Sequence, residues 1–190
     1  MDPQQMNSNP AGAHALIERA ATAVTARTRW VDDFPAPGVR FADLTPVFAD
    51  GEAFGAVIAA LAATAPDAEL VAGVDARGFL LGGGIAHALG VGVLAVRKAG
   101  KLPPPVDTRE YSLEYGTAAI EIPQDSVRLR GRRVLVVDDV LATGGTLSAT
   151  AELLDAAGAL VVAVAVVTEI EALGGRARLE KYPVTSLVRL

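Results

Sequence analysis

VLVVDDVLATGGT, residues 134–146, is the stretch from which the fold can be predicted. Four apolar residues in a row, three of them valine, are typical of a short strand that is buried on both faces. Asp138 and Asp139 follow this run directly, and a Thr-Gly-Gly-Thr turn then opens a helical stretch from Thr146 to Ala157. Strand, turn and helix in this order predict one unit of a parallel sheet that is covered by helices.

Two further apolar runs extend this unit into a sheet. Leu70 to Val74 and Leu160 to Val167 are also apolar without polar alternation, and a helical stretch from Phe79 to Leu89 follows the first of them. Gly158 provides a C-terminal stop for the helical stretch that precedes the second apolar run. We therefore expect an α/β fold with a mostly parallel central sheet flanked by helices.

The segments before this core have a helical pattern. An amphipathic helix is expected from about Ala13, ending before Phe34, after which two prolines prevent helix formation. Asp50 is placed to cap a second helix, which ends at Pro66. By contrast, the interval from Ala99 to Ile122 contains three consecutive prolines and then alternating residues. This pattern predicts a long loop that leads into a hairpin, and loops of this length are usually functional.

The composition limits the class of protein. A chain of 190 residues, 51% of them hydrophobic, is expected to form one domain, which we place at residues 13–190 after a flexible tail at 1–12. The net charge of −5 disfavours a nucleic-acid or anionic-membrane partner. The longest uncharged window, Gly78 to Val96, contains six glycines and reads as a helix followed by a strand, not as a membrane span. The tail lacks the apolar run of a signal peptide. The absence of cysteine fits a reducing cytoplasm and excludes thiolate chemistry.

The stretch at 134–146 also has the composition of a binding site. Glycines and small residues allow backbone N–H groups to converge on a phosphate at a helix N-terminus, and threonine hydroxyls add further donors. The carboxylates of Asp138 and Asp139 can accept hydrogen bonds from a sugar diol or hold a magnesium ion through water. In open α/β sheets, ligands bind at the carboxyl ends of the strands, which is where these residues are expected.

VLVVDDVLATGGT resembles the phosphoribosyl-diphosphate-binding motif of the type I phosphoribosyltransferases. The resemblance implies that Asp138 and Asp139 flank the ribose, act in catalysis and contact Mg²⁺ indirectly, through the substrate. It also implies that the turn holds the 5-phosphate of the substrate. We call residues 142–146 the phosphate turn; its members are Ala142, Thr143, Gly144, Gly145 and Thr146.

Four other segments resemble the adenine phosphoribosyltransferase branch of this family. FPAPGVRFADLTP, residues 34–46, is similar to the hood that covers the base. Main-chain groups of Arg40 and Ala42 would then meet the adenine edge, and a 6-oxo purine would leave buried polar groups unpaired. The branch usually has an aliphatic residue in place of Arg40 and a basic one in place of Ala42. Ile170 matches an aliphatic position that packs against the base.

Two segments resemble the diphosphate site of the branch. In ELVAGVDARGF, residues 69–79, the positions of Asp75, Ala76 and Arg77 contact the diphosphate, and a cis peptide bond often joins the first two. In RKAGKLP, residues 97–103, Arg97 and Lys101 match a segment that binds diphosphate and contacts a second subunit. The resemblance therefore implies a homodimer.

YSLEYG, residues 111–116, resembles the closing lid of the branch, which we place at about residues 99–118. The resemblance implies that Glu114 exchanges a proton with the purine and that Tyr115 contacts adenine. The implied reaction converts adenine and phosphoribosyl diphosphate to AMP and diphosphate with Mg²⁺, as in purine salvage.

Three alternatives remain at this point. Arg40 and Ala42 leave open a phosphoribosyltransferase for a 6-oxo purine such as xanthine. Some proteins of this fold only sense phosphoribosyl diphosphate and regulate transcription or RNA, although such regulators carry a DNA-binding domain or a basic face. An inactive paralogue is the third alternative, and the presence of Asp138, Asp139 and Arg77 argues against it.

Overall fold

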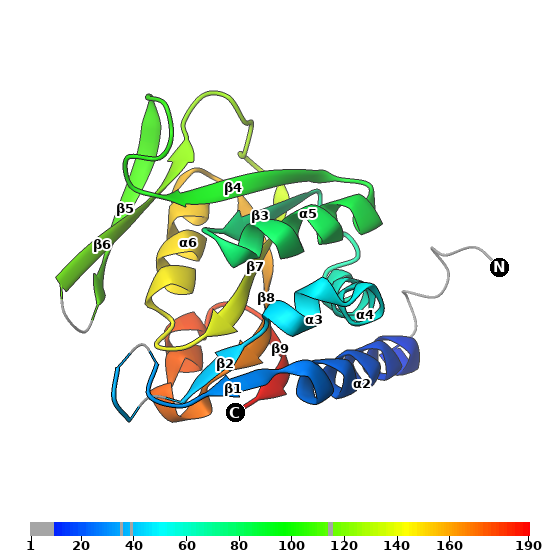
Figure 1. The fold of residues 1–190 in the computed structure, drawn as a ribbon. Coiled ribbons are helices and arrows are strands. Elements are labelled where there is room, and N and C mark those ends of the chain that lie inside the picture. Colours follow the sequence, from blue (N-terminus) through cyan, green and yellow to red (C-terminus); the bar gives the residue numbers. More distant parts are fainter. Residues whose placement is uncertain (1–9, 35, 39, 114–115) are drawn as a thin grey trace.

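A seven-stranded sheet forms the centre of the computed structural model, which describes residues 10–34, 36–38, 40–113 and 116–190 (Figure 1). The order of its strands is β5-β6-β4-β3-β7-β8-β9. The five strands β4, β3, β7, β8 and β9 pair in parallel, in that order. Strand β6 is antiparallel to both of its neighbours, β4 and β5. The predicted α/β fold with a mostly parallel sheet is therefore confirmed. The strands are β3 (Leu70–Val74), β4 (Gly92–Lys98), β5 (Val106–Leu113), β6 (Gly116–Pro123), β7 (Arg133–Leu141), β8 (Leu160–Glu169) and β9 (Val184–Arg189).

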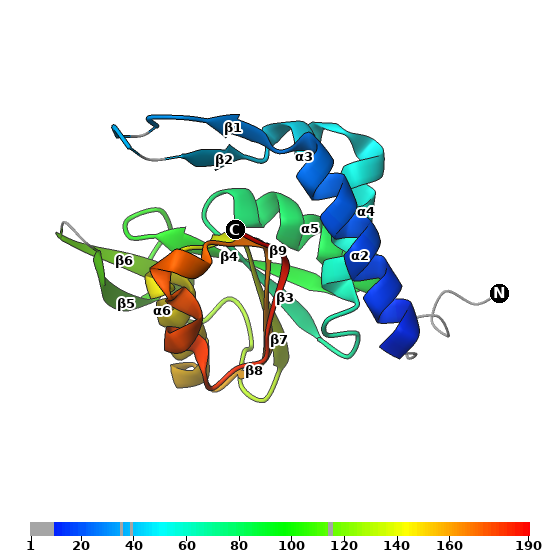
Figure 2. The same ribbon diagram turned by 90° about the horizontal axis from the view of Figure 1, so that it is seen from below.

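Helices cover both faces of this sheet, as Figure 2 shows from below. One face packs against α2 (Pro10–Arg27), α4 (Gly51–Ala62) and α5 (Arg77–Leu89), and the other against α6 (Gly145–Ala156). Neighbouring residues of β3 alternate between the two cores, with Val71 in the first and Ala72 in the second. Every residue of β3 is buried, which explains why its sequence is apolar without alternation.

The N-terminal region differs in part from the expected structure. Helix α2 begins at Pro10, three residues before the expected start, and Asp50 caps α4 as predicted, because its Oδ1 accepts a 2.8 Å hydrogen bond from the Ala53 N–H. Three short elements were not predicted: the antiparallel pair β1 (Arg29–Val31) and β2 (Phe41–Asp43), and helix α3 (Thr45–Ala49). Figure 2 shows that β1 and β2 form an arm separate from the main sheet.

The predicted hairpin is formed by β5 and β6. Its pairing runs without interruption from Val106 and Pro123 to Leu113 and Gly116. The two strands thus take up most of the interval that we expected to be loop, and only residues 99–105 connect β4 to β5. The window Gly78 to Val96 forms most of helix α5 and part of strand β4, as expected. In the part of the chain that the structure describes, no helix combines the length and apolar character needed to cross a bilayer.

Two short 3₁₀ helices after β8 were not predicted. They are η1 (Glu171–Leu173) and η2 (Gly175–Leu179), and they lead into the edge strand β9. Leu179 of η2 is fully buried in the core beside α6. Because β8 is parallel to β7, the connection that follows β8 lies at the same end of the sheet as the phosphate turn.

Candidate active site

The acid pair lies within β7, close to its carboxyl end. This strand extends to Leu141, four residues beyond the predicted apolar run, so that Asp138 and Asp139 are part of it. The Asp139 N–H donates a 2.8 Å hydrogen bond to Asp138 Oδ1. Burial, and next the negative charge of Asp139, raise the pKa of Asp138 well above its ordinary value. The pair therefore favours a ligand that brings hydroxyl donors or positive charge.

Arg77 contacts the second acid of the pair. Its Nε lies 2.8 Å from Oδ2 of Asp139, a side chain that is only 8% exposed. Within the described residues this oxygen accepts no well-aligned hydrogen bond, so the contact is an ion pair that leaves room for another donor. The guanidinium also lies 5.8 Å from the centre of the Phe41 ring in β2. Arg77 thus connects the acid pair to the hood.

The loop after β3 is held by a second ion pair. Arg97 Nε donates a 3.0 Å hydrogen bond to Asp75 Oδ2, and the Arg97 guanidinium lies over the ring of Phe79. The peptide bond between Asp75 and Ala76 is cis, as the resemblance implied. Arg97 is thus paired with the loop after β3, while Lys101 is exposed in the β4–β5 connection.

The phosphate turn has a backbone that only glycine can adopt at one position. Gly144 has a φ of +79° and forms the N-cap of α6 without a side-chain cap, so the first N–H groups of that helix are open to an anion. A Cβ atom on Gly144 would lie 2.4 Å from the carbonyl oxygen of Gly175. Conversely, a Cβ on Gly175 would lie 2.1 Å from the Ala142 carbonyl oxygen. Sequence reasoning missed Gly175, although the Gly-Gly pair after β8 was a usable signal.

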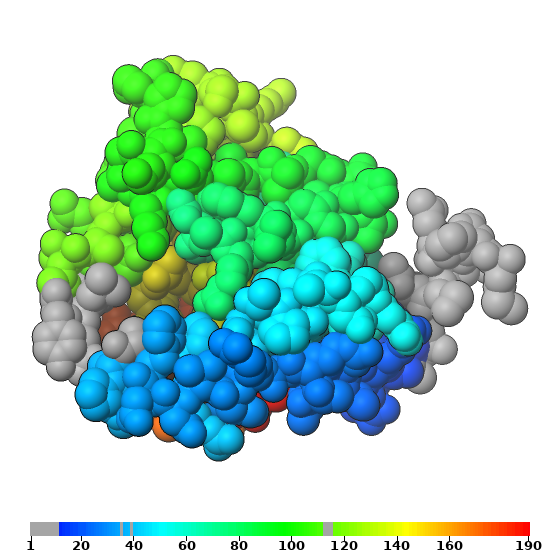
Figure 3. All heavy atoms as spheres, in the orientation of Figure 1, coloured from blue at the N-terminus to red at the C-terminus, as the bar shows by residue number. Residues whose placement is uncertain are grey.

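A cavity of about 560 Å³ lies beside Asp75, Asp138 and Thr146. It lies between the hairpin and the ends of β3 and β7, and a volume of this size is typical of small-molecule sites. The Thr146 hydroxyl donates a 3.2 Å hydrogen bond to the Tyr111 hydroxyl of β5 at its edge. In Figure 3 a hollow opens between the blue N-terminal arm and the light green hairpin, with yellow atoms at its floor. The polar residues that line the cavity are Asp75, Lys98, Tyr111, Asp138 and Thr146.

Lys98 lies in the predicted diphosphate segment RKAGKLP and Tyr111 in the predicted lid, but neither was assigned as a site residue. Both follow from the strand pairing, because β4 and β5 lie on either side of β6. The predicted residues Glu114 and Tyr115 lie outside the described residues.

The predicted base-binding residues lie around the hood and the end of β8. The Arg40 guanidinium is 4.5 Å from the centre of the Trp30 ring and forms an ion pair with Asp32, so its side chain belongs to the outer arm. Ala42 pairs with Trp30 in the β1–β2 ladder. Ile170 is half-buried, and its N–H donates to the Leu141 carbonyl at 2.9 Å, which brings it next to the start of the phosphate turn.

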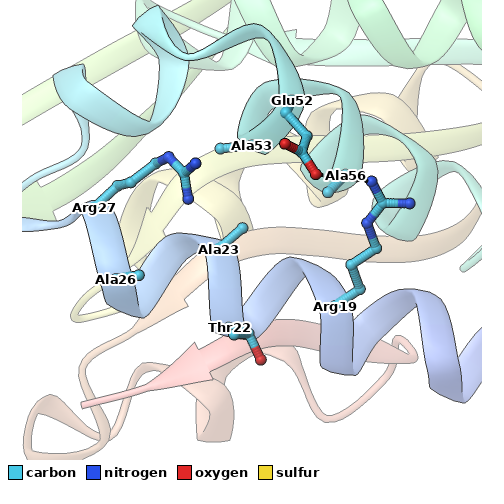
Figure 4. Close-up of a pocket in the computed structure, with 8 residues that line it drawn as sticks. All are labelled: Arg19, Thr22, Ala23, Ala26, Arg27, Glu52, Ala53 and Ala56. Carbon is cyan, nitrogen blue, oxygen red and sulfur yellow. Dashed lines mark hydrogen bonds and ion pairs between the residues drawn. The ribbon is translucent and has the colours of Figure 1, made fainter.

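A different hollow, of about 300 Å³, lies between α2 and α4 (Figure 4). Its charged residues are already paired, Arg19 with Glu52 at 3.3 Å and Arg27 with Asp50 at 3.0 Å. The remaining lining is mostly alanine. This hollow therefore lacks the groups that a phosphorylated sugar requires.

The acid pair fits an indirect magnesium site. Among the described residues there is no cluster of three or more acidic or histidine side chains that could hold a metal. Mg²⁺ usually takes one or two carboxylates and completes its six ligands with water and substrate oxygens. The buried Asp139 oxygen that accepts no hydrogen bond is consistent with such a shared site.

Three comparisons bear on this geometry. Residues 48–188 match the family described as the phosphoribosyl transferase domain. The chain is 72% identical over 171 residues, covering 90% of each protein, to the adenine phosphoribosyltransferase of Nocardia farcinica. The crystal structure of the adenine phosphoribosyltransferase from Thermoanaerobacter pseudethanolicus is similar with a TM-score of 0.84 at 43% identity, covering 90% of this chain and 99% of that one. The Saccharomyces cerevisiae enzyme, complexed with an imino-altritol bisphosphate and adenine, has a TM-score of 0.83 at 35% identity, covering 89% and 98%.

Proposed function

The chain belongs to the phosphoribosyltransferase family, in its adenine phosphoribosyltransferase branch, and we propose how its residues transfer a phosphoribosyl group to adenine. The reaction converts adenine and phosphoribosyl diphosphate to AMP and diphosphate, a step of purine salvage. The observation that carries the residue assignments is a single cavity lined by Asp138, by Lys98 and by Thr146 at the start of α6. The ion pair of Asp139 with Arg77 follows Asp138 directly in the chain.

The substrate is proposed to bind with its 5-phosphate on the phosphate turn. The open N–H groups at the start of α6 supply donors to its oxygens. The Thr146 hydroxyl, which donates to Tyr111 in this structure, would turn to donate to the phosphate. Its ribose hydroxyls donate to Asp138 and Asp139, and its diphosphate lies toward Asp75 and Ala76, where Arg77, Lys98 and Lys101 provide positive charge. Arg97 contributes by holding Asp75 in place.

Loss of diphosphate leaves a positively charged, oxocarbenium-like sugar. Asp138 and Asp139 stabilise this charge from one side, while Arg77 stabilises the leaving diphosphate. We propose that Asp138 and Asp139 hold Mg²⁺ through the substrate and water, and the bound ion would neutralise diphosphate charge. The hairpin covers the site and keeps out water, which would otherwise capture the sugar.

Adenine is proposed to bind between the hood and Ile170. Main-chain groups at Arg40 and Ala42 pair with the edge of the base, so the unusual side chains at these positions do not change its recognition. Glu114 accepts the proton that adenine loses, as general base. Tyr115 is proposed to contact the base as well.

We expect AMP to form from adenine and no detectable mononucleotide from the 6-oxo bases, because their edge would leave buried hood groups unpaired. The measurement offers adenine, guanine, hypoxanthine and xanthine separately to the purified protein with magnesium and phosphoribosyl diphosphate. Turnover of xanthine or hypoxanthine would instead mean that the hood recognises a 6-oxo purine. Binding of phosphoribosyl diphosphate without turnover of any base would favour a sensor.

A homodimer is proposed to form through the surface made by α5 and β4. Leu80 on α5 is 57% exposed and Val93 on β4 is 51% exposed, an apolar surface that a second copy would cover. The basic segment RKAGKLP begins at the end of the same strand, so a partner on this surface would also lie near Arg97 and Lys101. We place the enzyme in the cytoplasm, consistent with a chain that has no cysteine.

We expect Val93→Asp to convert a dimer to a monomer, because it places a charge in the contact. Light scattering during size-exclusion chromatography measures the mass. Leu160→Asp is the matched control, since Leu160 is 56% exposed at the start of β8, and it should remain dimeric. A wild-type protein that is monomeric at micromolar concentration would contradict the proposal.

A further inference from the structure

Glu169 and Arg176 form an ion pair at the carboxyl end of β8, beside the phosphate turn. Arg176 donates from Nε to Glu169 Oε1 at 2.8 Å and from Nη2 to Oε2 at 2.5 Å. The Glu169 side chain is only 5% exposed, and Ser186 of β9 donates to the same carboxylate at 2.6 Å. None of the steps proposed above uses this pair, although a buried, bidentate arginine contact is among the strongest side-chain interactions.

The pair fixes the position of η2 on the sheet. Glu169 is the last residue of β8, Arg176 lies in η2, and the Arg176 Nη1 also donates to the Val184 carbonyl of β9 at 2.9 Å. One guanidinium therefore joins η2 to two adjacent parallel strands. Gly175, the residue before Arg176, can move little while these hydrogen bonds are intact.

Gly175 in turn lies against the backbone of the phosphate turn. A Cβ on Gly175 would lie 2.1 Å from the Ala142 carbonyl oxygen and 2.7 Å from the Gly144 nitrogen. The backbones of these two segments therefore touch with no side chain between them. A shift of Gly175 would therefore move the turn or leave a gap behind it. The turn needs such support because its own conformation at Gly144 depends on a positive φ.

We propose that Arg176, paired with Glu169, is a positioning residue that sets the geometry of the phosphate turn through Gly175. The inference rests on the proposed function, because it takes the turn to bind the 5-phosphate of the substrate. Arg176 acts on the affinity for the phosphorylated sugar and does not touch the reacting atoms.

The charge of the pair is constant around neutral pH. Hydrogen bonds from Arg176 lower the pKa of Glu169 to about 2 and raise that of Arg176. Both groups thus stay ionised between pH 5 and pH 9. Loss of the pair should therefore change binding without changing the shape of the pH–rate profile.

The test compares Arg176→Gln with the wild-type enzyme. We expect the Kd for ribose 5-phosphate and the KM for phosphoribosyl diphosphate to rise at least tenfold, while kcat and the KM for adenine change less than threefold. Arg176→Lys should recover part of the loss, since its ammonium can pair with Glu169 but cannot also reach Val184. Titration calorimetry and initial rates measure these constants.

Arg133→Gln is the matched control. Arg133 joins β7 to Asp67 by an ion pair at the opposite end of the sheet, so its loss tests general weakening of the fold. Its constants should stay at wild-type values. If both variants lower the affinity for ribose 5-phosphate equally, or if Arg176→Gln has wild-type affinity, the positioning role is wrong. If Arg176→Gln fails to fold, the test rests on Arg176→Lys. A wild-type Kd for ribose 5-phosphate and a wild-type KM for phosphoribosyl diphosphate in that variant would also overturn the positioning role.

Thr146→Ala separates this inference from the assignment of the turn. Thr146 belongs to the phosphate turn, and its loss should weaken ribose 5-phosphate binding directly. If this variant binds ribose 5-phosphate as the wild type does, the proposed phosphate site is wrong. If Thr146→Ala weakens binding and Arg176→Gln does not, only the positioning role fails.

Discussion

Asp138→Asn is expected to lower kcat/KM about 100-fold while it raises the melting temperature. The loss of activity follows because ribose hydroxyls donate to a carboxylate more strongly than to an amide, and such hydrogen bonds contribute about 1.5–3 kcal/mol each. The gain in stability follows because the ionised Asp138 side chain is desolvated beside Asp139 in the fold. Asparagine keeps the oxygen that accepts from the Asp139 N–H.

The sign of the pH dependence can be derived from the raised pKa. In the unfolded chain Asp138 loses its proton near the ordinary value of 3.8, whereas in the folded chain it holds the proton to higher pH. This group therefore makes the folded state less stable as the pH rises above about 4. Asparagine does not titrate, so the advantage of the variant should grow from pH 4 until the folded pKa is passed.

Thermal unfolding between pH 4 and pH 8, together with initial rates, measures both effects. Asp139→Asn is the matched control, because Asp139 is paired with Arg77 and its loss leaves that guanidinium without its anion. The control should lose activity without gaining stability. A lower melting temperature for Asp138→Asn at pH 7 would contradict the account of its burial.

The parts of the fold that sequence analysis predicted are those with local causes. Strands β3, β7 and β8 are apolar on both faces because helices cover both sides of the sheet, and this leaves a continuous pattern in each strand. Strands β1 and β2 have only three residues each and are half-buried or exposed, so they leave no periodic signal. Strand β9 lies at the sheet edge with a single buried residue, Leu187.

Site residues were predictable where their chemistry is contained in one short stretch of sequence. Asp138, Asp139 and Thr146 lie in one continuous motif, where residue type and spacing already indicate the chemistry. Arg176 and Lys98 depend on partners that are distant in sequence or on strand order. Their roles therefore become visible only when the topology of the sheet is known.

Gly144→Ala is expected to raise the KM for phosphoribosyl diphosphate more than 100-fold and to destabilise the fold more than the same change at another glycine of similar φ. A non-glycine residue in this conformation costs about 1–3 kcal/mol. At Gly144, where φ is +79°, the new Cβ would in addition lie 2.4 Å from the Gly175 carbonyl oxygen. Overpacking of this kind costs about a further 1–3 kcal/mol. Because the obstacle is backbone, relief requires the phosphate turn to move away from η2.

Gly131→Ala isolates the conformational part of this effect. Gly131 has a φ of +76°, but a Cβ there would meet nothing within 4 Å. Urea unfolding should therefore show a loss of about 1–3 kcal/mol for Gly131→Ala and roughly twice that for Gly144→Ala. The KM for phosphoribosyl diphosphate should be unchanged in the first variant and raised more than 100-fold in the second. Equal destabilisation of the two variants would mean that the contact between the turn and Gly175 does not constrain the turn, and would weaken the positioning role of Arg176 as well.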